Sequence, residues 1–128
     1  MIVGTGIDLC SIPRMERAVR SRRFVERVFS PSEIEYAEKG RVHKTTRAAR
    51  YASAFAAREA FAKASGVSIY RLALSSRFSL ERGEDGAPSL YVPPEIDAAF
   101  ESGAKRAWVS ISHDGDYAAA VVTLEAIP

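Results

Sequence analysis

The 128-residue chain has few of the residues that cross-link proteins or bind zinc: one cysteine, Cys10, and two histidines, His43 and His113. A single cysteine excludes a disulfide within the chain and any zinc site built from several cysteines. The apolar residues, 47% of the total, form no run near the ~18 that a membrane span requires. The first eight residues lack the basic start and long apolar stretch of a signal peptide, so we expect a cytoplasmic protein that does not enter a membrane.

Length and composition predict one globular domain over residues 1–128. The chain is too short for two separate cores of ordinary size. Charged residues make up 27% of it, which together with the apolar content argues against disorder.

Positive charge is concentrated in the first half of the chain. Residues 1–58 contain 12 Lys/Arg and 6 Asp/Glu, whereas residues 59–128 contain 6 and 10, so the halves carry +6 and −4. Ser11 can cap a helix on which Arg14, Arg17, Arg20 and Arg23 lie near one side. This basic face indicates an acidic partner, although complementary subunits or simple solvation would produce the same asymmetry.

The order of the predicted elements indicates an α+β protein with helices packed on an antiparallel sheet. A strand over residues 2–8 precedes the basic helix. A capping box at Ser30 to Glu33 begins a second helix, which ends near Gly40. A long helix then runs from Thr46 to Ser65, and Gly66 ends it. Strands are predicted over 75–81, 89–92, 107–112 and 117–124, with turns at Asp85-Gly86 and Asp114-Gly115. A short helix follows Pro93-Pro94 and ends at Gly103.

The long helix carries the most informative charged pair. Glu59 and Lys63 are four residues apart and share a helical face, with Phe55 one turn earlier. An exposed ion pair would stabilise the helix by ~0.3–0.5 kcal/mol and nothing more. The alanines and phenylalanines around the pair indicate a largely buried helix, in which a metal ion and a phosphate would be suitable partners.

Asp8 is the second candidate, at the end of the first strand and after Gly4 and Gly6. The Gly-Thr-Gly segment is not a dinucleotide fingerprint, because the third glycine is absent. Asp8 could simply cap the strand end. With Glu59 it could instead supply two oxygen ligands, which is too few for a calcium cage but suits Mg²⁺ completed by water and a substrate diphosphate.

His113 follows Ser112 where a strand enters a turn. It could donate to a phosphate or an adenine, or it could bond only to nearby backbone. A Ser-His-Asp hydrolase is poorly supported, because Ser112, His113 and Asp114 are consecutive and neighbours in a strand point to opposite faces. The chain also has no Gly-x-Ser-x-Gly elbow.

Three segments occur together in a fixed order: Gly6-Ile7-Asp8 leading to Ile12-Pro13-Arg14, then Phe55-Ala56-Ala57-Arg58-Glu59-Ala60-Phe61-Ala62-Lys63-Ala64, then Val109-Ser110-Ile111-Ser112-His113. In this combination the chain resembles the holo-[acyl carrier protein] synthases, the short class of 4'-phosphopantetheinyl transferases. The resemblance covers nearly the whole chain and implies the fold of that family.

The resemblance implies transfer of 4'-phosphopantetheine from coenzyme A to a serine of an acyl carrier protein, in fatty acid or polyketide biosynthesis, with release of adenosine 3',5'-bisphosphate. It also implies a homotrimer with active sites between subunits. Asp8 and Glu59 would hold Mg²⁺, Lys63 would neutralise phosphate charge, and Glu59 would help to deprotonate the serine. Two further sets of residues would bind the substrates: coenzyme A at Arg58, Lys63, Gly66, Gly86, Pro88, Ser112 and His113, and the carrier protein at Arg14, Arg17, Arg20 and Arg23.

The chain departs from the family at two positions. Arg58 stands where lysine usually precedes the metal-binding glutamate, and Ala54 stands where a basic residue usually precedes the first aromatic, with Arg50 and Arg47 as possible substitutes. These departures keep open a catalytically inactive carrier-binding module. A small basic RNA- or ribosome-binding protein would explain the arginines, but residues 11–23 lack the interleaved aromatics expected of one. We therefore expect no nucleic-acid partner.

Overall fold

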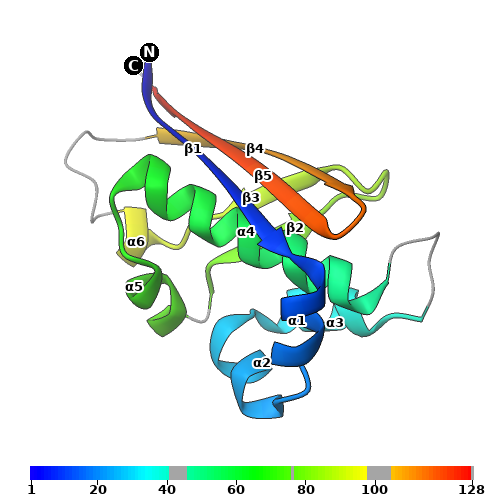
Figure 1. Cartoon of the computed structure of the whole chain (residues 1–128). Helices are drawn as coiled ribbons and strands as arrows, with labels where there is room; N and C mark the ends of the chain where they lie inside the picture. Colours follow the sequence, from blue (N-terminus) through cyan, green and yellow to red (C-terminus); the bar gives the residue numbers. More distant parts are fainter. Residues whose placement is uncertain (41–45, 76, 98–104, 128) are drawn as a thin grey trace.

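The computed structural model describes residues 1–40, 46–75, 77–97 and 105–127 (Figure 1). Their elements follow the order β1 (Ile2–Ser11), α1 (Ile12–Ala18), α2 (Arg22–Val28), α3 (Pro31–Glu38), α4 (Arg47–Ser65), α5 (Ile69–Leu74), β2 (Ser79–Arg82), β3 (Pro88–Tyr91), α6 (Pro94–Asp97), β4 (Lys105–Asp114) and β5 (Tyr117–Ala126). No helix in these ranges is both long enough and apolar enough to cross a membrane.

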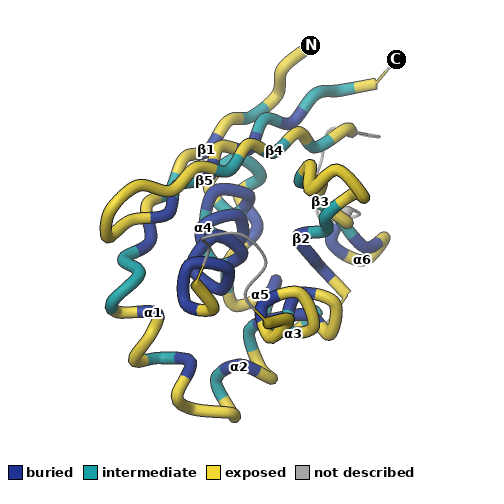
Figure 2. Tube along the Cα trace, turned by 90° about the vertical axis from the view of Figure 1, so that its right-hand side faces the viewer, coloured by how far each residue is buried: buried dark blue, intermediate teal, exposed yellow. Residues whose placement is uncertain are grey.

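The larger sheet has the strand order β1-β5-β4, and both pairings are antiparallel. Alternate residues of β5 are buried on the side of α4, namely Ala118, Ala120, Val122 and Leu124. Figure 2 shows the buried α4 between this sheet and the shorter helices α2, α3 and α5. A second sheet consists of β2 and β3 alone. The predicted α+β class with an antiparallel sheet is therefore confirmed.

Helix α4 is the centre of the fold, and its sequence defines both of its ends. The Thr46 hydroxyl accepts the Ala49 N–H at 3.1 Å, which caps the start. Gly66 ends the helix in the left-handed conformation, with φ of +78°, which glycine adopts without strain. Alanines occupy most of the buried positions between these caps, and such small side chains allow neighbouring backbones to approach.

The closest approach is between α4 and β1, at Gly4 and Gly6. A Cβ atom added to Gly6 would lie 2.0 Å from the Ala60 carbonyl oxygen, and one added to Gly4 would lie 2.0 Å from that of Ala64. No side chain fits at such a distance, so both positions require glycine. The inward-facing residues of β1 therefore lie directly against α4.

The basic helix predicted from Ser11 to Arg23 is wrong, because the structure divides it into α1 and α2. The Ser21 hydroxyl accepts the Phe24 N–H at 3.2 Å and caps a new helix. The break lets Val19 and Val25 both enter the core, at 3% and 1% exposure. Of the four arginines, Arg14 and Arg17 lie on α1, Arg20 lies in the turn, and Arg23 lies on α2.

Other boundaries differ less. Residues 69–74 form α5, which the sequence analysis did not predict, and the strand predicted from residue 75 begins at Ser79. The helix after Pro93 covers Pro94–Asp97, and its predicted end at Gly103 lies outside the described residues, as does His43. The capping box at Ser30 and Glu33 is confirmed, as are the glycine turns at Gly86 and Gly115.

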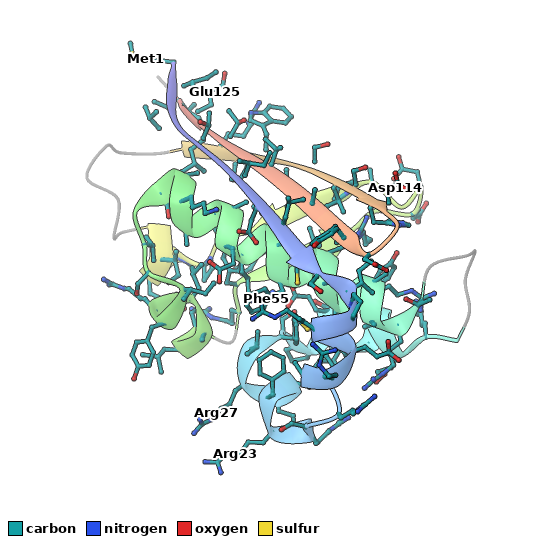
Figure 3. All side chains as sticks on the ribbon, viewed as in Figure 1. Met1, Arg23, Arg27, Phe55, Asp114 and Glu125 are labelled. Carbon is teal, nitrogen blue, oxygen red and sulfur yellow. The ribbon has the colours of Figure 1, made fainter. Side chains whose placement is uncertain are left out.

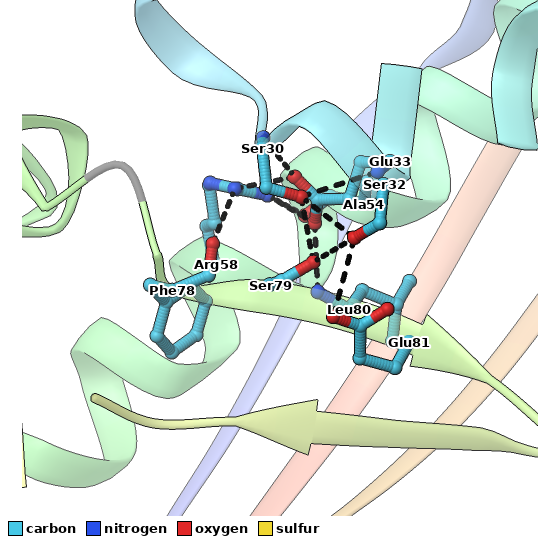
Figure 4. A network of polar contacts seen from close by, with 9 residues as sticks. All are labelled: Ser30, Ser32, Glu33, Ala54, Arg58, Phe78, Ser79, Leu80 and Glu81. Atoms are coloured by element: carbon cyan, nitrogen blue, oxygen red, sulfur yellow. Dashed lines mark hydrogen bonds and ion pairs between the residues drawn. The ribbon is translucent and has the colours of Figure 1, made fainter. Parts of the chain in front are cut away.

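A buried polar network joins α3, α4 and β2 (Figure 4). The Glu33 carboxylate accepts the Ser30 N–H and the Leu80 N–H, each at 2.8 Å, and pairs with the Arg58 guanidinium. Arg58 also donates to the Phe78 carbonyl oxygen at 3.1 Å. Both charged side chains are at most 3% exposed, so burial is compensated by pairing and by several hydrogen bonds.

Substituting Gly6→Ala should destabilise the fold, because the added methyl group meets the Ala60 carbonyl rather than a movable side chain. Overpacking of this kind costs about 1–3 kcal/mol in the free energy of unfolding. Gly40→Ala is the matched control, because a Cβ atom there meets nothing within 4 Å, and it should change stability by about 0.5 kcal/mol or less. Denaturant melts of both variants make the comparison, and equal stabilities would contradict the close approach.

Candidate active site

The close packing of β1 on α4 brings Asp8 to the helix. Gly4, Gly6 and Asp8 alternate along β1 and therefore share its inward face. Asp8 is paired in register with the buried Ala120 of β5, and its side chain is 18% exposed. The carboxylate thus lies at the edge of the sheet, over the C-terminal half of α4.

Lys63 pairs with Asp8 across this contact. Its Nζ donates to the Ile7 carbonyl oxygen at 2.9 Å and to Asp8 Oδ1 at 3.2 Å. The Lys63 side chain is 56% exposed, so solvent screens the pair and its contribution to stability is small. The sequence analysis considered Glu59 as the partner of Lys63, but the ion pair that forms joins α4 to β1.

Glu59 is half-buried on the same side of α4, one turn before Lys63. Burial raises the pKa of its carboxyl group above the ordinary value, and the nearby Asp8 raises the pKa further while Lys63 lowers it. Two carboxylates and one ammonium group therefore share a small, partly desolvated region. The three groups together carry a net charge of −1, so the region favours an additional cation.

The donor set fits Mg²⁺. Asp8 and Glu59 provide hard oxygen ligands from two rigid elements, and Mg²⁺ commonly uses one or two carboxylates together with water and substrate phosphates. Within the described residues, no group of three or more His, Cys, Asp or Glu side chains lies close enough together to hold a metal by itself. A cation held by Asp8 and Glu59 would therefore depend on further ligands from a substrate.

A hollow of about 250 Å³ begins beside these residues. Elements β1, α1, α2 and α4 all contribute to its lining, through Leu9, Cys10, Ser11, Arg14, Met15, Ala18, Phe24 and Phe55. Phe55 lies one turn before Glu59, and Arg14 is close enough to influence the Cys10 thiol. Burial and then Asp8 raise the pKa of that thiol to about 11, so Cys10 stays protonated at neutral pH. The sequence analysis missed Met15, Phe24 and this hollow.

The structure places the remaining predicted coenzyme A residues at three separate locations. Gly66 lies one turn after Lys63 at the end of α4, whereas Gly86 and Pro88 belong to the hairpin of β2 and β3. On β4, His113 is paired with Ala118 of β5, and Ala118 is paired with Cys10 of β1. His113 therefore lies on the face of the sheet that covers α4, but about 10 Å from Cys10, which is the width of two strand spacings. Ser112 faces the other side of the sheet. One chain therefore brings together Asp8, Glu59 and Lys63, but not His113, Ser112 or the hairpin.

Arg58 requires a correction. Its side chain is 3% exposed, pairs with Glu33, and lies between the rings of Phe29 and Phe78 at 5.4 and 5.5 Å from their centroids. The predicted contact of Arg58 with coenzyme A is therefore wrong for this structure, since the guanidinium is enclosed in the core.

The structure also places Ala54 in the core, and its suggested substitutes, Arg50 and Arg47, contact α3. Ala54 is 4% exposed. Arg50 donates to carbonyl oxygens at the end of α3, among them that of Ala37 at 3.4 Å, and Arg47 pairs with Glu38. The two substitutes therefore stabilise the end of α3 and lie apart from Asp8.

The predicted carrier-binding arginines form an exposed basic surface despite the helix break. Arg14, Arg17, Arg20 and Arg23 are all exposed on α1, α2 and the turn between them. Figure 3 shows Arg23 and Arg27 extending from α2 away from the body of the molecule. Arg14 also lines the hollow, so this surface continues to the edge of the Asp8–Glu59–Lys63 cluster.

The pKa of Glu59 in metal-free protein should respond in opposite directions to two substitutions. Asp8→Asn removes a repulsive charge and should lower this pKa, whereas Lys63→Met removes an attractive one and should raise it. Because the folded pKa lies above the unfolded value, Glu59 costs stability above its folded pKa, and the cost disappears as the pH falls below the unfolded value. Carbon-detected NMR titration measures the shifts, and an unchanged pKa in both variants would place Glu59 away from Asp8 and Lys63.

Comparison with known proteins agrees with this geometry. Residues 4–122 match the model of the 4'-phosphopantetheinyl transferase superfamily. A holo-[acyl-carrier-protein] synthase of Geobacter sulfurreducens is 38% identical over 128 residues, covering 98% of each chain.

Solved structures are similar over the same length. The holo-[acyl-carrier-protein] synthase of Helicobacter pylori in complex with coenzyme A has a TM-score of 0.78 and 31% identity, covering 94% of this chain and 99% of that one. The holo-(acyl-carrier-protein) synthase of Bacillus anthracis in complex with CoA (3',5'-ADP) has a TM-score of 0.75 and 28% identity, covering 99% of each chain. Sequence, fold and the three predicted motifs thus lead to one conclusion: the chain belongs to the 4'-phosphopantetheinyl transferase superfamily, as a holo-[acyl carrier protein] synthase.

Proposed function

We propose that the protein transfers the 4'-phosphopantetheine of coenzyme A to a serine of an acyl carrier protein, in a reaction that depends on Mg²⁺ and serves fatty acid or polyketide biosynthesis in the cytoplasm. The serine oxygen forms a bond to the phosphorus that carries pantetheine. The bond from that phosphorus to the bridging oxygen breaks, and adenosine 3',5'-bisphosphate leaves. The observation that carries the proposal is the junction of Asp8 with Glu59 and Lys63.

Each residue of the cluster has a separate role in this reaction. Asp8 and Glu59 would hold Mg²⁺, which when bound neutralises the diphosphate of coenzyme A. Lys63 is exposed enough to exchange Asp8 for a phosphate oxygen and to neutralise charge as the leaving phosphate forms. The raised pKa of Glu59 suits a carboxylate that accepts the proton of the attacking serine.

The carrier protein would dock on the basic surface of α1 and α2. Four exposed arginines attract acidic partners, and the hollow beside Arg14 and Phe55 offers an apolar contact that stops one turn from Glu59. Charge would mainly speed the encounter, while the apolar contact would hold the partner. A serine presented at the inner end of the hollow would lie close to Glu59.

The outer face of the larger sheet supports assembly into a homotrimer with sites between subunits. It carries exposed apolar side chains on all three strands, among them Ile7 at 62%, Leu9 at 64%, Trp108 at 53% and Val121 at 41% exposure. Contiguous apolar surface of this kind is uncommon on monomers. A second copy would also supply groups that one chain holds far from Asp8, such as His113. Sedimentation velocity showing a monomer at assay concentrations would contradict this assembly.

The catalytic proposal predicts that Asp8→Ala and Glu59→Ala each abolish transfer while the protein stays folded. Both substitutions remove a ligand of the cation that the diphosphate needs. The assay is the increase in intact mass of a carrier protein incubated with coenzyme A and Mg²⁺. Glu35→Ala, at an exposed carboxylate of α3, is the control and should retain wild-type turnover. Normal turnover in either cluster variant, or no Mg²⁺-dependent transfer by the wild type, would refute the proposal.

For Lys63 the structural and catalytic roles predict different effects of substitution on stability and on turnover. Its exposed pair with Asp8 contributes about 0–1 kcal/mol to stability, so Lys63→Ala should melt nearly as the wild type does. Loss of a preorganised donor to the reacting phosphate should lower turnover about 10²–10³-fold at saturating coenzyme A. Lys63→Arg should recover part of the rate, because it keeps the charge but not the shape. Wild-type turnover in Lys63→Ala would show that Lys63 only forms a surface pair with Asp8 and has no role in the reaction.

Reversing charge at Arg14 and Arg17 together should weaken binding of the carrier protein far more than binding of coenzyme A. Added salt should weaken the wild-type association, but the reversed variant much less. Reversing Arg71 and Arg77, which lie outside α1 and α2, changes the net charge equally and serves as the control. Surface plasmon resonance with the carrier protein measures the effect, and equal losses in both double variants would place the docking surface elsewhere.

A further inference from the structure

The Lys63 ammonium group lies next to both carboxylates of the candidate active site. Its Nζ donates to Asp8 Oδ1 at 3.2 Å and to the Ile7 carbonyl oxygen at 2.9 Å. Burial and Asp8 raise the pKa of the Glu59 carboxyl group, while Lys63 lowers it, so the lysine charge also reaches Glu59. The ammonium group therefore contacts oxygen atoms in the same region in which we propose that a metal ion binds.

The contacts of Lys63 are weak enough to exchange. Its side chain is 56% exposed, so water competes for both hydrogen bonds and screens the ion pair. An open hollow of about 380 Å³ adjoins the ammonium group and is lined by Ile7, Asp8, Leu9 and Lys63. Because lysine has a flexible four-carbon stem, rotation of the side chain alone can move its charge from Asp8 to another acceptor in this hollow.

We infer that Lys63 is an internal cation that competes with the metal ion for Asp8, so that the metal ion binds tightly only together with coenzyme A; this inference rests on the proposed function. In the ligand-free chain, Lys63 neutralises part of the charge of Asp8 and Glu59. It must give up Asp8 when a divalent cation binds alone, and it gains no anion in return. When the diphosphate of coenzyme A is also present, phosphate oxygens replace Asp8 as its acceptors.

This exchange makes a distinct contribution to the coupling between the two ligands. The factor by which coenzyme A tightens cation binding equals the factor by which the cation tightens coenzyme A binding. Phosphate oxygens that bind the cation contribute to this factor whether or not Lys63 is present. Competition adds a part that depends on Lys63, because the lysine opposes the cation only while the diphosphate is absent. Loss of Lys63 should therefore strengthen binding of the cation alone and reduce the coupling.

The first test measures Mn²⁺ binding to the full chain by electron paramagnetic resonance, at a pH where both carboxylates are ionised. No carrier protein is present, so no transfer occurs. Without coenzyme A, Lys63→Met should bind Mn²⁺ about tenfold more tightly than the wild type, because neither the competing hydrogen bond nor its charge remains. The tightening of Mn²⁺ binding by coenzyme A should be about tenfold smaller in this variant than in the wild type.

Arg14→Gln is the matched control for charge. Arg14 is exposed, and its charge acts on the Cys10 thiol, as does the charge of Asp8, so it lies at the same end of β1. If Lys63 opposed the cation only through the general field, both substitutions would tighten Mn²⁺ binding similarly. Competition for Asp8 predicts that Arg14→Gln changes the Mn²⁺ affinity by about twofold or less, since solvent screens an exposed charge.

The second test follows the ammonium group itself by NMR with isotope-labelled lysine. The chain has four lysines, and Lys63→Arg identifies the Lys63 signal. Asp8→Asn removes the carboxylate partner and provides the signal of a released ammonium group. Saturating Mg²⁺ alone should move the wild-type signal to that of Asp8→Asn, and addition of coenzyme A should then restore a slowly reorienting group.

Three results would overturn the inference: unchanged or weaker Mn²⁺ binding in Lys63→Met, an equal gain in Arg14→Gln, or a Lys63 signal that Mg²⁺ alone leaves unaltered. Lys63 is exposed near the end of α4, so we expect its variants to fold, and a denaturant melt checks this. Failure of the wild type to transfer phosphopantetheine would instead overturn the proposed function, because neither binding test depends on transfer.

Discussion

The absence of side chains at Gly4 and Gly6 is the constraint on which the site depends. Only glycine allows the backbone of β1 to lie against the carbonyl groups of Ala60 and Ala64 on α4. Two residues further along the inward face of β1, Asp8 meets the side chains that α4 presents one turn apart. A larger separation would leave Glu59 and Lys63 on a helix surface without a partner, and the three charges would not form a cluster.

The two ion pairs of α4 differ in burial and in the number of hydrogen bonds that accompany them. Glu33 and Arg58 are enclosed and hydrogen-bonded to each other and to backbone groups, which is the condition for tolerating buried charge. Asp8 and Lys63 form one exposed contact, while Glu59 remains half-buried with a raised pKa. In the first arrangement both buried charges are paired and hydrogen-bonded. The second carries a net negative charge in a partly buried region, and a bound cation would relieve the repulsion between its two carboxylates.

Local signals in the sequence were sufficient for the elements with clear ends. Thr46 and Gly66 bound α4 as predicted, and the Ser30–Glu33 capping box begins α3. The break between α1 and α2 was missed because the three-residue spacing of the arginines continues through it. Ser21, a capping residue three positions before Phe24, was the available signal.

Tertiary contacts were harder to predict than elements. The motif of α4 identified Glu59 and Lys63, and the resemblance joined them to Asp8, but spacing within a helix could not show that Lys63 pairs with β1 rather than with Glu59. The enclosure of Arg58 by Glu33, Phe29 and Phe78 depends on three distant segments, so no local pattern shows it. This burial also weakens the case for an inactive carrier-binding module, because Arg58 and Ala54 lie in the packed interior.

In the proposed reaction, Asp8 and Glu59 would form half of a cation site that coenzyme A completes. Calorimetric titration of coenzyme A into the wild-type protein, with and without Mg²⁺, tests it most directly. A shared site predicts positive coupling, with tighter binding of coenzyme A when Mg²⁺ is present and loss of that difference in Asp8→Asn. Equal affinity of the wild type for coenzyme A in the presence and absence of Mg²⁺ would contradict the shared site.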